Sequence, residues 1–183
     1  MSRDDKQVAL LFALIGIGAW LWFTRSGKAV AASAGESVAT GVEYVTSNIR
    51  GERNNNPGNI RISANTWAGK LPASQNTDGA FEQFDTVENG IRALAKLLIA
   101  YNSKYGLNTV RAIINRYAPP SENITDSYVN AVANSIGVSA DAPIAVRDPA
   151  TLFELAKAII RHENGRVAYN DEIIREGVNR ALV

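Results

Sequence analysis

Apolar residues recur at intervals of three and four through much of the second half of the chain, which is the spacing of one face of an α-helix. The first stripe spans residues 91–101, and Thr86 precedes it as an N-cap. A second stripe spans residues 110–117 with Thr109 in the same role, and a Pro-Pro pair directly after it stops the helix. These signals predict two consecutive helices.

Three more helices are predicted further along the chain. Thr125 or Asp126 opens a helix that Gly137 ends. The stretch DPATLFELAKAIIRHENG starts with Asp148 as cap and a proline in the first turn, so it predicts a helix that ends at ENG. The last helix starts at about Asp171 and has apolar residues on one face.

Residues 60–84 lack the helical period. Aromatic and apolar positions are interrupted there by turn residues, which predicts short extended strands and turns. The fold class predicted for residues 51–183 is therefore mainly α with a small β-like flap.

The N-terminal end differs from the rest. Val8–Phe23, VALLFALIGIGAWLWF, is uncharged and nearly all apolar, and it is somewhat shorter than the ~20 residues that cross a typical bilayer. Lys6 and Arg25 flank this run and can snorkel, so it is predicted to be an N-terminal transmembrane helix that binds a lipid membrane. A cleaved signal peptide and a buried core helix are the alternatives. Basic residues lie on both sides of the run, which leaves its orientation open.

The chain therefore divides into a membrane anchor at residues 1–24, a linker at residues 25–50 and a folded domain at residues 51–183. Small residues dominate the linker. Its apolar positions between Val38 and Ile49 recur every three or four residues, which indicates a short stalk helix.

Composition excludes several classes of function. The chain has no Cys and one His, so a disulfide framework, a cysteine nucleophile and a thiolate or multi-His metal site are excluded, and no cofactor is expected. Residues 51–183 carry equal numbers of basic and acidic side chains. Nucleic acid is not expected as a partner, because phosphate binding normally shows as a basic excess.

The sequence RGERNNNPGNIR, residues 50–61, concentrates short amides in one stretch. Asn tolerates left-handed turns and Pro-Gly favours turns, so one interpretation is a polar loop that enters the flap. The other is a set of paired donors and acceptors for a neutral ligand rich in hydroxyl and amide groups, such as an N-acetylated sugar chain. Aromatic side chains offer flat surfaces for sugar rings, although each tyrosine taken singly is more typical of a core: Trp67, Tyr101, Tyr117, Tyr128 and Tyr169.

A second candidate is Glu163 in the sequence RHENG. His162 and Glu163 begin like a zinc HExxH motif, but Arg166 stands at the second ligand position and the chain has no other His. The negative end of the helix dipole and burial against apolar neighbours should raise the pKa of Glu163, as a glycosidic general acid requires. The alternative is a solvated carboxylate paired with Arg161 or Arg166.

These motifs carry a resemblance to known proteins. RNNNPGNIR, an F..F segment, G.RAL, PP.EN.T..Y and ENG occur in this order, as in the peptidoglycan-cleaving lysozyme-like proteins of bacteriophages. The chain is also similar to lytic transglycosylases and flagellar-type glucosaminidases, in which a helix ending in Glu-Ser-Gly carries the catalytic acid. In those families the Glu-bearing helix comes first, whereas here it comes last, as a circular permutation would give. The resemblance implies an α+β lysozyme-like fold, circularly permuted.

The resemblance also implies a reaction, which is cleavage of the β-1,4 bond between N-acetylmuramic acid and N-acetylglucosamine in peptidoglycan. Glu163 would be the catalytic acid. A hydrolase would need a second carboxylate, for which Glu52, Asp78 and Asp85 are nominees, whereas lytic transglycosylases need none. Substrate-binding positions carried over from the motifs and the loop are Asn55, Asn56, Asn59, Arg61, Tyr101, Glu122, Tyr128 and Tyr169.

The expected location is the membrane of a phage virion, or the bacterial inner membrane with the domain facing the cell wall. Partners would be peptidoglycan, lipid and other virion proteins. A virion component that kept this fold without its activity, and bound the wall or served a structural role, is the alternative function. Cleavage of peptide cross-links would require a metal site or a Cys/His pair, and the composition of the chain provides neither.

Overall fold

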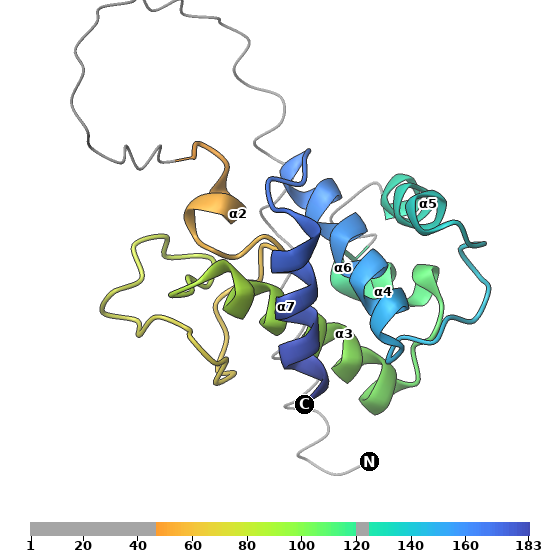
Figure 1. Ribbon diagram of the computed structural model, residues 1–183, viewed down its shortest axis with the longest axis horizontal. Coiled ribbons are helices and arrows are strands. Elements are labelled where there is room, and N and C mark those ends of the chain that lie inside the picture. Colours follow the sequence, from red (N-terminus) through yellow and green to blue (C-terminus); the bar gives the residue numbers. More distant parts are fainter. Residues whose placement is uncertain (1–46, 120–124) are drawn as a thin grey trace, which may run out of the picture.

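The computed structural model of the protein describes residues 47–119 and 125–183. Within these ranges the fold is mainly helical, as predicted, and Figure 1 shows its helices with the flap on one side. The helices are α2 (Arg50–Arg53), α3 (Val87–Tyr105), α4 (Val110–Tyr117), α5 (Thr125–Ile136), α6 (Pro149–Asn164) and α7 (Asp171–Leu182).

The predicted caps form. Thr86, Thr109 and Asp148 each accept a hydrogen bond from the backbone N–H three residues later, at 3.3, 3.2 and 2.8 Å. Gly165 follows α6 with a φ of 70°, a left-handed conformation that favours glycine. The ENG sequence therefore ends α6 as expected, with Glu163 in its last turn.

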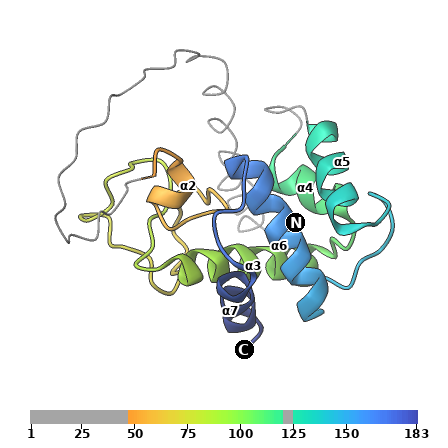
Figure 2. The same ribbon diagram turned by 45° about the horizontal axis from the view of Figure 1, so that its top comes forward.

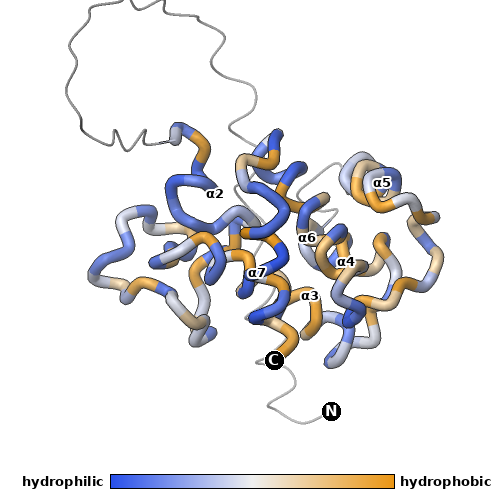
Figure 3. The backbone as a smooth tube through the Cα atoms, viewed as in Figure 1, coloured by the Kyte–Doolittle hydropathy of each residue, from blue (hydrophilic) through white to orange (hydrophobic). Residues whose placement is uncertain are grey.

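The core is built from buried residues of α3, α4, α5, α6 and α7, and α3 packs closely against α7. Figure 2, turned by 45° from Figure 1, shows α7 against α3 with α6 beside them. Figure 3 shows hydrophobic residues recurring along α3, α4 and α6. Fully buried side chains of these helices include Ile91, Leu94, Leu98, Ile113, Ile114, Leu152, Leu155, Ile159 and Ile160. Burial of this many aliphatic side chains supplies the main favourable term for folding.

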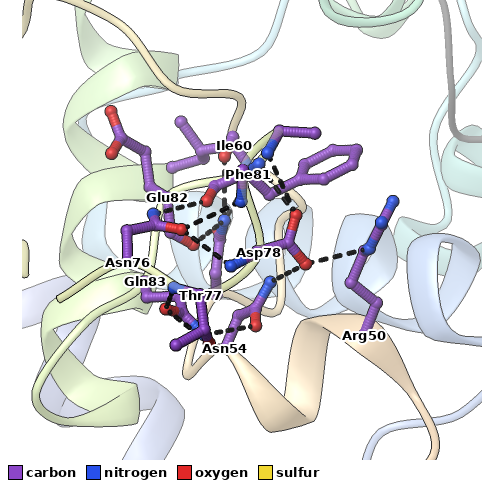
Figure 4. Close-up of polar contacts among 12 residues, drawn as sticks. Arg50, Asn54, Ile60, Asn76, Thr77, Asp78, Phe81, Glu82 and Gln83 are labelled. Atoms are coloured by element: carbon purple, nitrogen blue, oxygen red, sulfur yellow. Dashed lines mark hydrogen bonds and ion pairs between the residues drawn. The ribbon is translucent and has the colours of Figure 1, made fainter. Parts of the chain in front are cut away.

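The flap is held by polar contacts more than by regular strands. Its backbone pairs only at isolated bridges in the described residues, Arg61 with Phe81 and Lys70 with Phe84. The Asp78 carboxylate is almost fully buried, at 3.0 Å from the Arg50 guanidinium, and it accepts hydrogen bonds from Asn54 at 2.8 Å and from the Phe81 N–H at 3.0 Å (Figure 4). A buried carboxylate needs such partners, and here they tie α2 to the flap.

Two features differ from the sequence-based expectation or lie beyond the described residues. Helix α2 was not predicted, and Ile49 before it has an extended backbone, so the predicted stalk helix does not continue through this residue. The apolar run Val8–Phe23 lies outside the described residues. Within residues 47–119 and 125–183, no helix is long and apolar enough to cross a membrane.

The close contact between α3 and α7 gives a test of the packing. Gly177 of α7 lies against Ile91, and an added Cβ would be 2.6 Å from the Ile91 Cβ and 2.9 Å from the Glu88 carbonyl oxygen. Gly to Ala in a helix normally stabilises by about 1 kcal/mol, but overpacking costs about 1–3 kcal/mol. Gly177→Ala should therefore lower the free energy of unfolding, measured by chemical denaturation. Asn179→Ala at an exposed position of α7 is the control and should not lower it.

Candidate active site

Glu163 is at the centre of the candidate site. It is half-buried in the last turn of α6, next to the fully buried Ile159 and Ile160. The Tyr128 hydroxyl of α5 donates a hydrogen bond to its Oε1 at 3.0 Å, and the Asn59 amide donates to its Oε2 at 3.1 Å. The carboxyl group is thus held at both oxygens by side chains from two other segments.

The surroundings of Glu163 favour its neutral form. Burial raises the pKa of the carboxyl group, while the hydrogen bonds from Asn59 and Tyr128 lower it, and burial has the larger effect. The net direction is the raised pKa that its place on an apolar helix predicted. The carboxyl group has lost much of its hydration, but the residue retains some exposed surface through which a ligand can reach it.

The surroundings of Tyr128 keep its hydroxyl protonated, so that it can donate the hydrogen bond to Glu163. It is buried to 1% exposure, and both burial and the nearby Glu163 charge raise the pKa of its phenol well above the usual value. The phenol is therefore protonated at any physiological pH. Its ring stacks on His162, with the ring centroids 3.5 Å apart and the planes 12° from parallel.

The asparagines of the loop have different contacts. Asn56 is fully buried, donates to the Ile60 and Glu82 carbonyl oxygens at 2.9 Å each, and accepts from the Ile60 N–H. Asn55 has a φ of 48° and donates to the Phe84 carbonyl oxygen at 3.0 Å. Asn56 has no accessible surface, and both ends of its amide are bonded within the loop and the flap, so the structure gives it a scaffolding position. Asn55 also serves the turn, and its amide nitrogen is engaged by the flap.

Among these asparagines, Asn59 alone contacts Glu163. Hydrogen bonds from two helices to the loop backbone hold Asn59 in this position. Asn59 has a left-handed φ of 48°. The Tyr117 hydroxyl donates to the Gly58 carbonyl oxygen, and the Asn164 amide donates to the Pro57 carbonyl oxygen at 2.7 Å. The backbone on the N-terminal side of Asn59 is therefore fixed to α4 and to the end of α6, the helix that carries Glu163.

A glycine permits this approach. Gly51 of α2 lies so near Asn164 that an added Cβ would overlap the Asn164 Oδ1. The same Cβ would be 3.1 Å from the Asn59 Oδ1 and from the Asn56 carbonyl oxygen. A side chain at this position would require the Asn164 amide to move from its place between α2, the loop and the end of α6.

Within the described residues, no hydrogen bond, ion pair or ring contact joins the remaining predicted binding residues to Glu163. The Arg61 guanidinium lies 5.1 Å from the Phe81 ring centroid. Tyr101 is buried beneath Arg116, and burial raises its pKa to about 12, so it is a core residue. Tyr169 is half-buried. Glu122 lies outside the described residues.

The site also contains residues that the sequence analysis did not assign to it. Tyr117 was considered only as a flat surface for sugars, yet its pKa is raised first by burial and then by the Glu163 charge, so it lies close to the acid. Asn164 and the stack of His162 on Tyr128 had no local signal at all, because both depend on how α6 docks against other segments.

The three nominated second carboxylates are all engaged elsewhere. The Arg166 guanidinium donates to both oxygens of Glu52, at 2.7 and 2.6 Å, and holds the pKa of Glu52 below its usual value. Asp78 binds Arg50 and Asn54 in the flap. Asp85 accepts from the Asn89 amide at 2.7 Å. Among the described residues, no group of three or more His, Cys, Asp or Glu side chains could hold a metal ion.

No family model matches the chain. It is similar to Protein P5 of Pseudoalteromonas phage PM2, with 36% identity over 151 residues that cover 81% of this chain and 91% of the phage protein. The chain belongs to the family of this phage protein. The matched portion is longer than residues 51–183, so the similarity extends into the N-terminal fifty residues.

The raised pKa of Glu163 in this member of the P5 family has a consequence for stability. As pH rises, the unfolded chain loses the Glu163 proton at the ordinary pKa while the folded chain still holds it, so the free energy of unfolding falls until the raised pKa is passed. Glu163→Gln has no such loss, and Tyr128 can still donate to its amide oxygen. The melting temperature of Glu163→Gln minus that of wild type should therefore grow from pH 4 to pH 8. A difference that stays flat or shrinks would contradict the raised pKa.

Proposed function

We propose that the protein is a membrane-anchored enzyme that cleaves the glycan strands of peptidoglycan, as a lytic transglycosylase or muramidase. The observation that carries the proposal is the Glu163 carboxyl group, half-buried with a raised pKa and held at both oxygens by Tyr128 and Asn59. A glycosidic acid must keep its proton near neutral pH and release it to the leaving oxygen. Desolvation moves the pKa of Glu163 in the direction that the first condition requires, and the residual exposure of the side chain leaves it open to a substrate for the second.

In the proposed reaction Glu163 donates its proton to the oxygen that bridges N-acetylmuramic acid to N-acetylglucosamine. The bond between that oxygen and C1 of the muramic acid breaks, and the substrate acetamido oxygen stabilises the developing positive charge at C1. The 6-hydroxyl of the same sugar then attacks C1 and returns its proton to the Glu163 carboxylate. No water is consumed, and the product ends in a 1,6-anhydro ring.

The lytic transglycosylase route is favoured over hydrolysis by the state of the other carboxylates. A hydrolase of the usual type needs a second carboxylate at a defined distance across the scissile bond. Glu52 and Asp78 are in ion pairs with arginines, and Asp85 is hydrogen-bonded to the start of α3. An intramolecular nucleophile supplied by the substrate removes the need for such a group.

The wider context fits the same proposal. A helix that carries its acid at the C-terminal end, beside a flap and an amide loop, resembles the lysozyme-like arrangement in circularly permuted order. Membership of a family of bacteriophage proteins is compatible with a virion component that opens the wall during entry or lysis. Residues 8–23 would anchor it in the virion membrane or the bacterial inner membrane, near other virion proteins, with the domain facing the wall.

The first test replaces the proposed acid. Glu163→Gln should reduce the rate at which the full-length protein, in detergent, clears a suspension of purified murein by about 10²–10⁴-fold, the usual contribution of a general acid. Glu154→Gln, at an exposed position on the same helix, is the matched control and should clear murein at the wild-type rate. Equal clearance by wild type and Glu163→Gln would remove Glu163 from the mechanism.

The second test identifies the products. Glycan fragments released by the full-length protein should end in 1,6-anhydro-muramic acid, which mass spectrometry separates from a reducing end by the mass of one water. Reducing N-acetylmuramic acid would make the enzyme a muramidase, and reducing N-acetylglucosamine a glucosaminidase. No released sugar from folded protein across several murein types would favour the alternative, a wall-binding or structural virion component without activity.

A further inference from the structure

The single histidine of the chain lies directly beside the proposed acid. His162 precedes Glu163 in the last turn of α6, and its ring stacks on Tyr128 of α5 at a centroid distance of 3.5 Å. Burial lowers the pKa of His162, so the ring is neutral at pH 7 and stacks as a flat heteroaromatic surface. Tyr128 is thereby held at two points by two consecutive residues, its ring face by His162 and its hydroxyl by Glu163.

The ring plane of a phenol controls the direction of its O–H bond. Conjugation between the oxygen and the ring keeps the O–H in the ring plane, so a ring that turns about its long axis carries the hydrogen away from its acceptor. The 12° angle between the two ring planes means that His162 covers the face of Tyr128 and opposes this rotation. The stack thus bears directly on the hydrogen bond that Tyr128 donates to the Glu163 Oε1.

We propose that His162 is a positioning residue that acts on Glu163 through Tyr128, because its ring fixes the plane in which the Tyr128 hydroxyl points at the acid. The role assigned to His162 in catalysis rests on the proposed function, whereas the coupling of the three side chains does not. His162 touches neither the scissile bond nor the proton that is transferred. Its effect is to keep one of the two hydrogen-bond donors of Glu163 in line.

If the three side chains are coupled in this way, changing His162 should change the pKa of Glu163. The hydrogen bond from Tyr128 lowers the pKa of the Glu163 carboxyl, against the larger effect of burial. Removing the stack should loosen that bond and raise the Glu163 pKa further, by up to the same amount as removing the hydroxyl itself. The loss of one hydrogen bond to a carboxylate corresponds to a rise of about 1–2 in pKa.

The experiment is a double-mutant cycle on the full-length protein in detergent, with the Glu163 pKa followed by ¹³C NMR of Glu labelled at the carboxyl carbon and assigned by its loss in Glu163→Gln. His162→Ala and Tyr128→Phe should each raise the pKa. His162→Ala in the Tyr128→Phe background should add nothing, because the hydroxyl through which His162 acts is gone. His162→Phe keeps a flat ring over Tyr128 and should restore the wild-type pKa.

Each other outcome overturns the proposal. An equal rise from His162→Ala with and without the Tyr128 hydroxyl would mean that His162 acts on Glu163 directly. No rise from His162→Ala, or a rise in His162→Phe as large as in His162→Ala, would mean that the stack has no such effect. If His162→Ala fails to fold, judged by circular dichroism, His162→Leu takes its place, since it fills the space without a flat face and should raise the pKa in the same way.

Activity gives an independent readout. If the protein cleaves murein, the basic limb of its pH–rate profile should move to higher pH in His162→Ala and remain at the wild-type pH in His162→Phe, because the acid must be protonated to work. A limb that does not move in His162→Ala while the NMR pKa rises would show that His162 does not serve catalysis. If wild type releases no sugar while the NMR cycle gives the expected pattern, the proposed function fails and the coupling stands.

Discussion

A carboxyl group at the C-terminal end of a helix is in an unfavourable place for a negative charge, and this constraint organises the site. The helix dipole and the buried Ile159 and Ile160 both oppose ionisation of Glu163. Folding could avoid the conflict by leaving the side chain in water, yet the chain packs it inward and provides two hydrogen-bond donors. The donors reduce the conflict without removing it, so the group remains easier to protonate than a free glutamate.

The loop around Asn59 shows how a short polar segment is made rigid enough to serve as one of these donors. Asn55 and Asn56 bind the flap backbone, and Asn54 binds flap side chains. The Pro57 and Gly58 carbonyl oxygens are bound from α6 and α4. Asp78 and Arg50 then fix the flap to α2. An amide-rich sequence therefore serves mainly as a scaffold, with one amide presented to the acid. A loop so fully bonded loses little further entropy when a ligand binds.

The helices were predictable because their signals are local. Thr86, Thr109 and Asp148 announce their helices through side chains that bond only three residues away, and Gly165 ends α6 through its own backbone freedom. Asn59 and Tyr128 were assigned to the same site as Glu163 from the motifs and the resemblance, since these residues are far apart in the sequence. Composition alone could not indicate which asparagine faces inward, as Asn56 demonstrates.

The contacts that escaped prediction depend on docking. The Glu52–Arg166 ion pair joins residues more than a hundred positions apart, and the His162 ring meets Tyr128 only because the start of α5 lies against the end of α6. Neither has a periodicity or a turn signature. The close approach at Gly51 is of the same kind, because a glycine in a short helix looks like a flaw until Asn164 and Asn59 are placed around it.

Asn59 has a property that none of the ionisable groups around it shares. Its Nδ2 faces the Glu163 carboxyl, while its Oδ1 is buried near Gly51 without a hydrogen-bond partner among the described residues. A half-turn of the amide exchanges donor for acceptor at the same position. That turn would place the Oδ1 against the Glu163 backbone carbonyl oxygen, which the Nδ2 now faces at 3.5 Å, so both contacts favour the donor orientation. Asn59 therefore supports the carboxylate form of Glu163 with a donor that carries no charge of its own.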